Sequence, residues 1–89
     1  DFSEFFNLHS LNLERFIIDE DNLKNFDKLE NLRELYLSFC NVHISHIKKI
    51  KKFKKLKKLW MNGIVSEIRD QHLSAIVNNC TDLRILNVD

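Results

Sequence analysis

The sequence has 89 residues, enough for one ordinary domain, and we take residues 1–89 as a single domain. Apolar residues make up 44% of the chain and charged residues 30%, which excludes an intrinsically disordered polymer. The formal net charge is only +1, unlike that of a dedicated nucleic-acid binder, and no apolar stretch approaches the roughly 18 residues of a membrane-spanning helix.

Four short segments share one pattern of apolar residues, leucine-x-x-leucine-x-apolar. They begin at Leu8, Leu32, Leu56 and Leu83, so the pattern recurs after 24, 24 and 27 residues. The last two apolar positions of each segment are two residues apart, which is the spacing of a strand with one buried face. We therefore expect four strands, near residues 11–13, 35–37, 59–61 and 86–88.

A second set of apolar residues precedes each strand, at a spacing of about three residues that is typical of a helix. Its members are Phe2 and Phe5, then Leu23, Phe26 and Leu29, then Ile47, Ile50 and Phe53, then Leu73, Val77 and Cys80. We expect Asp21, Ser45 and Asp70 to cap the helices that precede the last three strands. One strand and one helix cannot bury their apolar faces alone, so the units must stack and share a core.

The second unit of the chain carries the pattern Leu32-x-x-Leu35-x-Leu37-x-x-Cys40-x-Val42. It resembles a leucine-rich repeat. The resemblance implies an α/β fold of the solenoid type, a right-handed β-α superhelix with about three repeats and a partial fourth. Phe16 and Ile64 depart from the family pattern, which has asparagine or cysteine at this position of the turn.

The stretch from Ile68 to Val88, with Cys80 before Leu83, is similar to the cysteine-containing subclass of these repeats. That subclass is frequent in F-box proteins, the substrate-recruiting subunits of multi-subunit ubiquitin ligases. The resemblance thus implies a protein-protein interaction scaffold, and within the subclass the recognition of a ubiquitin-ligase substrate. Two alternatives stay open: binding of nucleic acid or another anionic partner, and ligand sensing in an innate-immune type of repeat receptor.

In a solenoid of this kind the strands line the concave face, and the residues that flank the buried strand positions point out from it. This places Tyr36 beside Trp60, the single tyrosine and the single tryptophan of the chain. Large amphipathic aromatics often dominate interface energy, so the pair is our leading contact site, although both rings could simply cover their neighbours. Phe39 either extends this patch or folds into the turn. The predicted partner surface comprises Asn12, Glu34, Tyr36, Lys58, Trp60, Asn62 and Asn87.

Lysines crowd the sequence between residues 48 and 58, where they alternate with apolar residues that the repeat assigns to the core. Clustered lysines favour a phosphate-rich partner, because phosphates release counterions when they bind lysine. The alternative, which we prefer, is a solvated helix face partly neutralised by acids such as Asp19, Glu20 and Asp21; an acidic protein partner fits as well. This basic face consists of Lys48, Lys49, Lys51, Lys52, Lys54 and Lys55.

Neither catalysis nor a cofactor is expected, because a single glycine excludes phosphate-binding and dinucleotide-binding loops and no nucleophile is paired with a base. Cys40, His43 and His46 have the spacing of metal ligands, but three ligands fall short of the four in a structural zinc site, so we expect no metal. Cys40 and Cys80 are interpreted as reduced, buried thiols, which favours an intracellular location in the cytoplasm or nucleus.

Both ends of the chain carry incomplete repeat patterns. Phe2 and Phe5 match the tail of a helix, and Asp89 ends a strand pattern. Because repeat stacks need covered ends, we expect the chain to be part of a longer repeat protein, with further repeats or a neighbouring chain over its ends.

Overall fold

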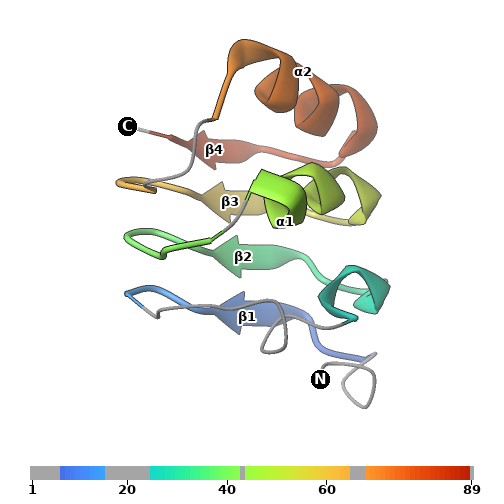
Figure 1. Cartoon of the computed structure of the whole chain (residues 1–89). Coiled ribbons are helices and arrows are strands. Elements are labelled where there is room, and N and C mark those ends of the chain that lie inside the picture. The colour runs from blue at the N-terminus through green and yellow to red at the C-terminus, as the bar shows by residue number, and fades with distance from the viewer. Residues whose placement is uncertain (1–6, 16–24, 43, 65–67, 89) are drawn as a thin grey trace.

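The computed structural model describes residues 7–15, 25–42, 44–64 and 68–88. These residues form a four-stranded parallel sheet whose strands are neighbours in chain order: β1 (Ser10–Asn12), β2 (Glu34–Tyr36), β3 (Lys58–Trp60) and β4 (Ile85–Asn87). Figure 1 shows the strands stacked one above another, all pointing the same way, with helical segments connecting them. The predicted α/β class is confirmed.

The sheet pairs the residues that the sequence pattern aligns. Leu11 lies opposite Leu35, Leu35 opposite Leu59, and Leu59 opposite Leu86. Backbone bonds continue the ladder beyond the strands, since the N–H groups of Leu37 and Met61 donate to the next strand at 2.8 Å. A slip of one residue would turn every leucine toward solvent, so the apolar pattern itself specifies this register.

The connections that lead back to each strand are helical. They are η1 (Phe26–Lys28), α1 (Ile44–Lys49) continued by η2 (Ile50–Lys52), and α2 (Asp70–Asn79). The expected helix residue Leu23 lies outside the described residues, as do Phe2 and Phe5. The described part of that second helical region is a single 3-10 turn that buries Phe26.

Two of the predicted helix caps are wrong. Ser45 lies within α1, which begins one residue earlier, and Asp70 is the first residue of α2 rather than its cap. The N–H of Arg69, which precedes α2, donates instead to Nδ1 of His72 at 3.1 Å. The carboxylate of Asp70 is still favourable in the first turn because it faces the positive end of the helix dipole. Asp21 lies outside the described residues.

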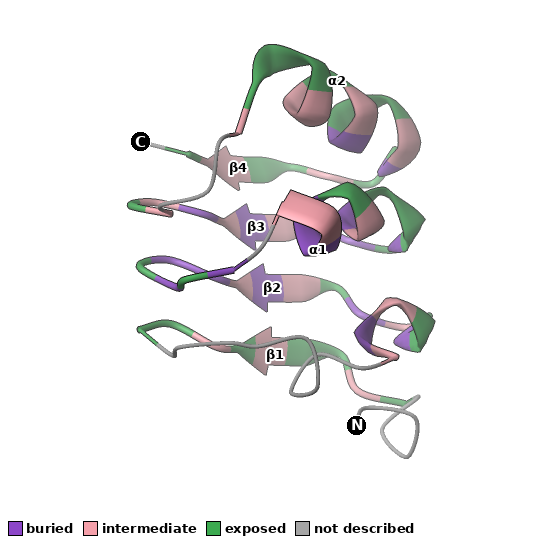
Figure 2. Cartoon of the chain, viewed as in Figure 1, coloured by how far each residue is buried: buried purple, intermediate pink, exposed green. Residues whose placement is uncertain are grey.

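A continuous core lies between the sheet and the helical segments, and Figure 2 shows its buried residues concentrated in β2, β3 and the helix faces that cover them. Phe26 and Phe53 meet edge to face, with ring centroids 5.4 Å apart. Burial of this apolar surface supplies the main stabilising free energy of such a fold. The core comprises Phe26, Leu29, Leu32, Leu35, Leu37, Cys40, Val42, Ile47, Ile50, Phe53, Leu56, Leu59, Met61, Ile76 and Cys80.

Two expected core residues are exposed, Val77 and Val88. Val77 corresponds to Phe26 and Ile50 in the repeat, yet half of its surface is open to solvent, while Ile76 is buried instead. Phe26 is covered from the following unit, where it packs edge-on against the buried ring of His46. Within the described residues no further helix follows α2, so no such covering residue is available for Val77.

Both cysteines are free and buried, as expected. The thiol of Cys40 donates to the carbonyl oxygen of Leu13, and that of Cys80 donates to the carbonyl oxygen of Ile50 at 3.5 Å. Burial raises the pKa of the Cys80 thiol above its ordinary value, so this thiol stays protonated and unreactive. None of the helices in the described residues has the length and apolar character to cross a membrane.

Candidate functional site

The outer face of the sheet is the side opposite the buried leucines. Because side chains alternate along a strand, the first and third residues of each strand point away from the core. In β2 and β3 these residues are half-buried, whereas the middle leucine is fully buried. The outer face consists of Ser10, Asn12, Glu34, Tyr36, Lys58, Trp60, Ile85 and Asn87.

Tyr36 and Trp60 stack on each other at the centre of this face. Their ring centroids are 4.8 Å apart and their planes differ by 15°. The stack follows from the register, since these two residues are direct partners in the parallel ladder. Both are half-buried, so each retains surface that a partner molecule can contact. The predicted adjacency of the two rings is therefore confirmed.

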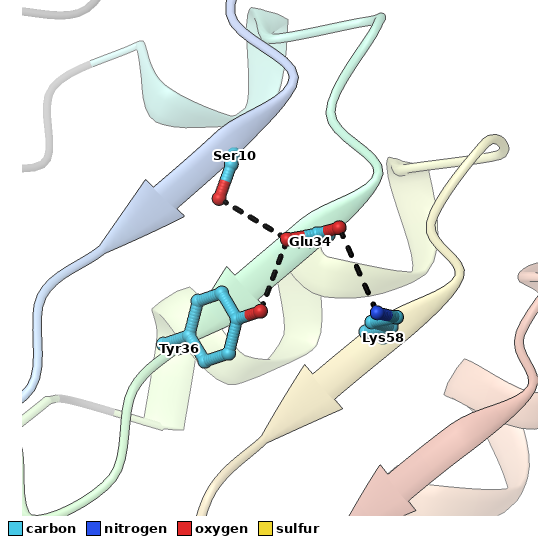
Figure 3. A network of polar contacts seen from close by, with 4 residues as sticks. All are labelled: Ser10, Glu34, Tyr36 and Lys58. Atoms are coloured by element: carbon cyan, nitrogen blue, oxygen red, sulfur yellow. Dashed lines mark hydrogen bonds and ion pairs between the residues drawn. The ribbon is translucent and has the colours of Figure 1, made fainter.

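The carboxylate of Glu34 organises the polar contacts around the stack (Figure 3). Its Oε1 accepts from the Tyr36 hydroxyl at 3.0 Å and from Ser10 Oγ at 3.5 Å, and its Oε2 lies 3.9 Å from Lys58 Nζ. The hydrogen bond to this carboxylate raises the pKa of the Tyr36 hydroxyl above its ordinary value. The negative charge of Glu34 is thus compensated within the face.

A chain of amides and a hydroxyl borders the stack on the side where the strands end. Ser38 Oγ donates to Asn62 Oδ1 at 3.1 Å, and Asn62 Nδ2 donates to Asn87 Oδ1 at 2.5 Å. Asn12 belongs to the same row as Asn87, but its Oδ1 accepts the backbone N–H of Glu14 at 3.0 Å. The structure therefore joins Asn62 and Asn87 and leaves Asn12 outside this chain of bonds.

The basic face on the helical side is tied to neighbouring units. Lys52 forms an ion pair with Asp27 at 3.2 Å, Lys54 donates to Asn79 at 3.1 Å, and Lys55 donates to Asn31 at 2.8 Å. Partial burial would raise the pKa of Asp27, but the hydrogen bond and charge of Lys52 outweigh it and lower that pKa. Asp19, Glu20 and Asp21, the acids expected nearby, lie outside the described residues.

The other lysines of the basic face are placed differently. Lys48 is exposed and Lys49 half-buried, both near the end of α1, while Lys51 is exposed in η2. Lys48 and Lys51 line a hollow of about 210 Å³ between α1 and α2, together with Gln71 and His72 from α2. Three of the six lysines thus bridge units, and two border a cleft.

A second row, of three cations and one histidine, was not recognised as a row from the sequence, although Lys57 belongs to the lysine run. His9, Arg33, Lys57 and Arg84 each follow the first leucine of a repeat segment, immediately before a strand. The carbonyl groups of Arg33 and Lys57 accept the N–H groups of the two residues that enter the next strand, at 2.7 to 3.1 Å. Their shared position in the repeat was the available signal. We call these four residues the entry row.

The turns that follow the strands also form a row. Arg15, Phe39 and Gly63 occupy one repeat position and all have positive φ, between 61° and 65°. The guanidinium of Arg15 lies 4.8 Å from the centre of the Phe39 ring, and that ring covers Gly63. Of the two alternatives for Phe39, the structure shows the second: its ring is 54% exposed and lies over the turns, against Arg15 and Gly63.

Two of the three residues with the spacing of metal ligands, Cys40 and His46, lie within the described residues. Cys40 and His46 are both buried, and no group of three metal-binding side chains forms within the described ranges. His43 lies outside them. Cys40 bonds to a backbone carbonyl and His46 packs against Phe26, so both side chains have structural contacts.

Comparison with known proteins assigns no family to the chain. A scan against protein-family models and a search of curated proteins found no match. The arrangement on which a function can be argued is therefore the one built above: an aromatic stack on an outer sheet face, with compensated polar groups around it and a row of cations along one border.

Proposed function

We propose that this chain belongs to a leucine-rich-repeat solenoid that binds a protein partner on the outer face of its sheet, and that it does not act as an enzyme. The observation that carries the proposal is the Tyr36–Trp60 stack, because paired aromatics with exposed surface are the residues that most often dominate binding energy. If the chain is the substrate-binding part of an F-box protein, as the repeat type suggests, the partner is a substrate of the ubiquitin ligase.

Preorganisation supports the outer face as the contact surface. The Tyr36 hydroxyl is held by Glu34, and the Trp60 ring is held against Tyr36, so binding costs little side-chain entropy. The backbone beneath them is fixed by the parallel ladder. A rigid aromatic platform with satisfied polar neighbours has the composition of the centre of a protein-protein interface.

The basic face is a weaker basis for function. Lys52, Lys54 and Lys55 form bonds between units, so a phosphate partner would have to compete with existing contacts. Exposed contacts of this kind contribute little free energy. They nevertheless spread the lysine charges over several units, so the charges do not converge on a single ligand site. Nucleic-acid binding therefore stays the second candidate and is tested below.

The proposal is tested by selecting binders from a displayed random-peptide library on the immobilised chain. We expect the selected peptides to bind the Trp60→Ala variant about tenfold more weakly than the unchanged chain. This ratio corresponds to ~1.4 kcal/mol, the least that a central aromatic contact residue contributes. Lys51→Ala, on the helical side, is the matched control and should bind as the unchanged chain does. If the selected peptides bind the folded Trp60→Ala variant as tightly as the unchanged chain, the outer face is not the contact surface.

A further inference from the structure

We propose that the partner segment is acidic and that its carboxylates bind Arg33, Lys57 and Arg84 of the entry row beside the Tyr36–Trp60 stack. This inference rests on the function proposed above and adds the chemistry of the partner. The three cations follow one another on neighbouring strands, because Lys57 N–H donates to the Arg33 carbonyl at 2.7 Å and Arg84 N–H donates to the Lys57 carbonyl at 2.8 Å. They thus span about 10 Å along one border of the face.

Within the described residues, Arg33, Lys57 and Arg84 form no ion pair. Among residues 7–15, 25–42, 44–64 and 68–88, the ion pairs formed are Lys52–Asp27 and Lys58–Glu34, neither of which includes the entry row. Arg33 and Arg84 are exposed and Lys57 is half-buried. Their charge is therefore available to a ligand, in contrast to that of Lys58.

A surface hollow lies where the entry row can receive a carboxylate. Its volume is about 270 Å³, and it is lined by Arg33, Lys55, Lys57 and one acid, Asp82. Three positive charges against one negative charge leave the hollow cationic. Arginine binds a carboxylate with two parallel hydrogen bonds, so Arg33 supplies directional recognition and the lysines supply charge.

The outer face beside this hollow is suited to the apolar part of the same segment. Arg33 and Lys57 directly precede β2 and β3, the two strands that carry the aromatic stack. An extended peptide rises about 3.3 Å per residue, so a short segment reaches from the hollow to the stack. The matching ligand is an acidic peptide segment with one large apolar residue.

A nucleic acid fits these features less well. Nucleic-acid surfaces are broad and basic, whereas this chain has a net charge of +1, and Arg33, Lys57 and Arg84 lie in a single row along one border of the face. The inner faces of Tyr36 and Trp60 cover each other, so no base can insert between them. A short acidic segment needs only the few cations present.

The test measures binding of a fluorescein-labelled peptide in which glutamate and serine alternate around one central leucine. A control peptide carries glutamine in place of glutamate. Single-stranded oligo-dT of similar length is the nucleic-acid probe. Trp60 is the only tryptophan, so its fluorescence reports contact at the stack. We expect the glutamate peptide to bind about tenfold more tightly than the glutamine peptide, which corresponds to two charge contacts of moderate strength.

The protein variants separate specific from general charge effects. Arg33→Gln with Lys57→Gln should weaken the glutamate peptide about tenfold. Lys48→Gln with Lys51→Gln removes the same charge from the helical side and should change binding less than twofold. Comparison of the two peptides on the unchanged chain needs no variant, so the inference stays testable if either double variant unfolds.

Each contrary outcome has its own meaning. Equal binding of the two peptides, equal loss in both double variants, or tighter binding of oligo-dT than of the glutamate peptide overturns the acidic partner. If library peptides depend on Trp60 but are insensitive to Arg33→Gln with Lys57→Gln, the proposed function stands and this inference fails. If they are insensitive to Trp60→Ala, the proposed function itself fails.

Discussion

The two inner strands, β2 and β3, and the two edge strands, β1 and β4, carry the same pattern of leucines but differ in how far those leucines are buried. Leu35 in β2 and Leu59 in β3 are fully buried, whereas Leu11 in β1 and Leu86 in β4 are half-buried. Figure 2 shows buried positions in β2 and β3 but not in β1 or β4. Leu11 and Leu86 pack against the core from the two edge strands, each of which pairs with one strand only. The contrast shows that, in this sheet, the burial of equivalent leucines depends on the number of neighbouring strands.

The same contrast extends to the candidate site. The aromatic stack joins the two inner strands, while the edge strands contribute Asn12 and Asn87 at the corresponding positions. The residues proposed to bind therefore stand on the two strands whose middle leucines are fully buried. A preorganised contact surface on a well-packed pair of strands loses little entropy on binding.

The largest expected effect contrasts equivalent leucines. Leu59→Ala should lower the free energy of unfolding by about 3 kcal/mol, because it empties a fully buried position. Leu11→Ala, at the equivalent position of the edge strand β1, should cost about 1 kcal/mol, since its side chain is only partly removed from water. Urea unfolding followed by circular dichroism measures both. Equal losses would contradict the dependence of burial on neighbours.

A smaller effect is expected in the turn after β3. Gly63 has φ of +64°, and a Cβ there would lie 2.5 Å from the Phe39 ring. Gly63→Ala should therefore cost about 1–2 kcal/mol, part from backbone strain and part from displacement of the ring. The double variant with Phe39→Ala should recover the steric part. If the cost is unchanged without the ring, the crowding plays no role.

The ion pair between η1 and η2 should contribute less still. Asp27 has a lowered pKa in the folded chain, so its stabilising effect is present above the unfolded value of 3.8 and is lost as the pH falls through the lower folded pKa. Asp27→Asn should reduce stability by less than about 1 kcal/mol near neutral pH. Urea midpoints near neutral pH and below 3.8 measure the change. A difference from the unchanged chain that persists in acid would contradict this assignment.

The smallest effect concerns ionisation rather than stability. Tyr36 is the only tyrosine, so the absorbance of tyrosinate reports its pKa directly. Glu34→Gln should move the titration midpoint down toward the ordinary value of 10.0, because the carboxylate that disfavours tyrosinate is gone. Glu14→Gln, an acid outside the outer face, serves as control and should shift the midpoint less. Identical curves for the unchanged chain and Glu34→Gln would disprove the hydrogen bond in solution.

Much of the arrangement was predictable because it depends on local periodicity. Alternation within a strand assigns Leu35 and Leu59 to the core and Tyr36 and Trp60 to the opposite face, and the spacing of 24 residues pairs them. Capping was not predictable in the same way. Ser45 and Asp70 are good capping residues, but the helix starts one residue earlier at α1 and the cap position precedes Asp70 at α2.

The placement of charge was the least predictable feature. The sequence does not distinguish the lysines of the run from one another. In the structure, three of them donate hydrogen bonds to residues 24 or 25 positions away: Lys52, Lys54 and Lys55. Conversely, Arg33, which stands outside the run, and Lys57, which belongs to it, are left without an ion pair in the described part of the chain. Long flexible side chains choose partners by distance after folding, which periodicity does not encode.

By itself, the sequence determined the strand register, the apolar core of the inner units and the adjacency of Tyr36 and Trp60, because these follow from a period of two within strands and a fixed repeat length. Only the tertiary structure decided that Glu34 binds three neighbours, that Phe39 lies over Gly63, that Val77 is exposed and that the entry row borders a cationic hollow. Except for the bond between Tyr36 and Glu34, these features depend on how residues of different strands and helices are placed relative to one another, and that geometry exists only in the folded chain.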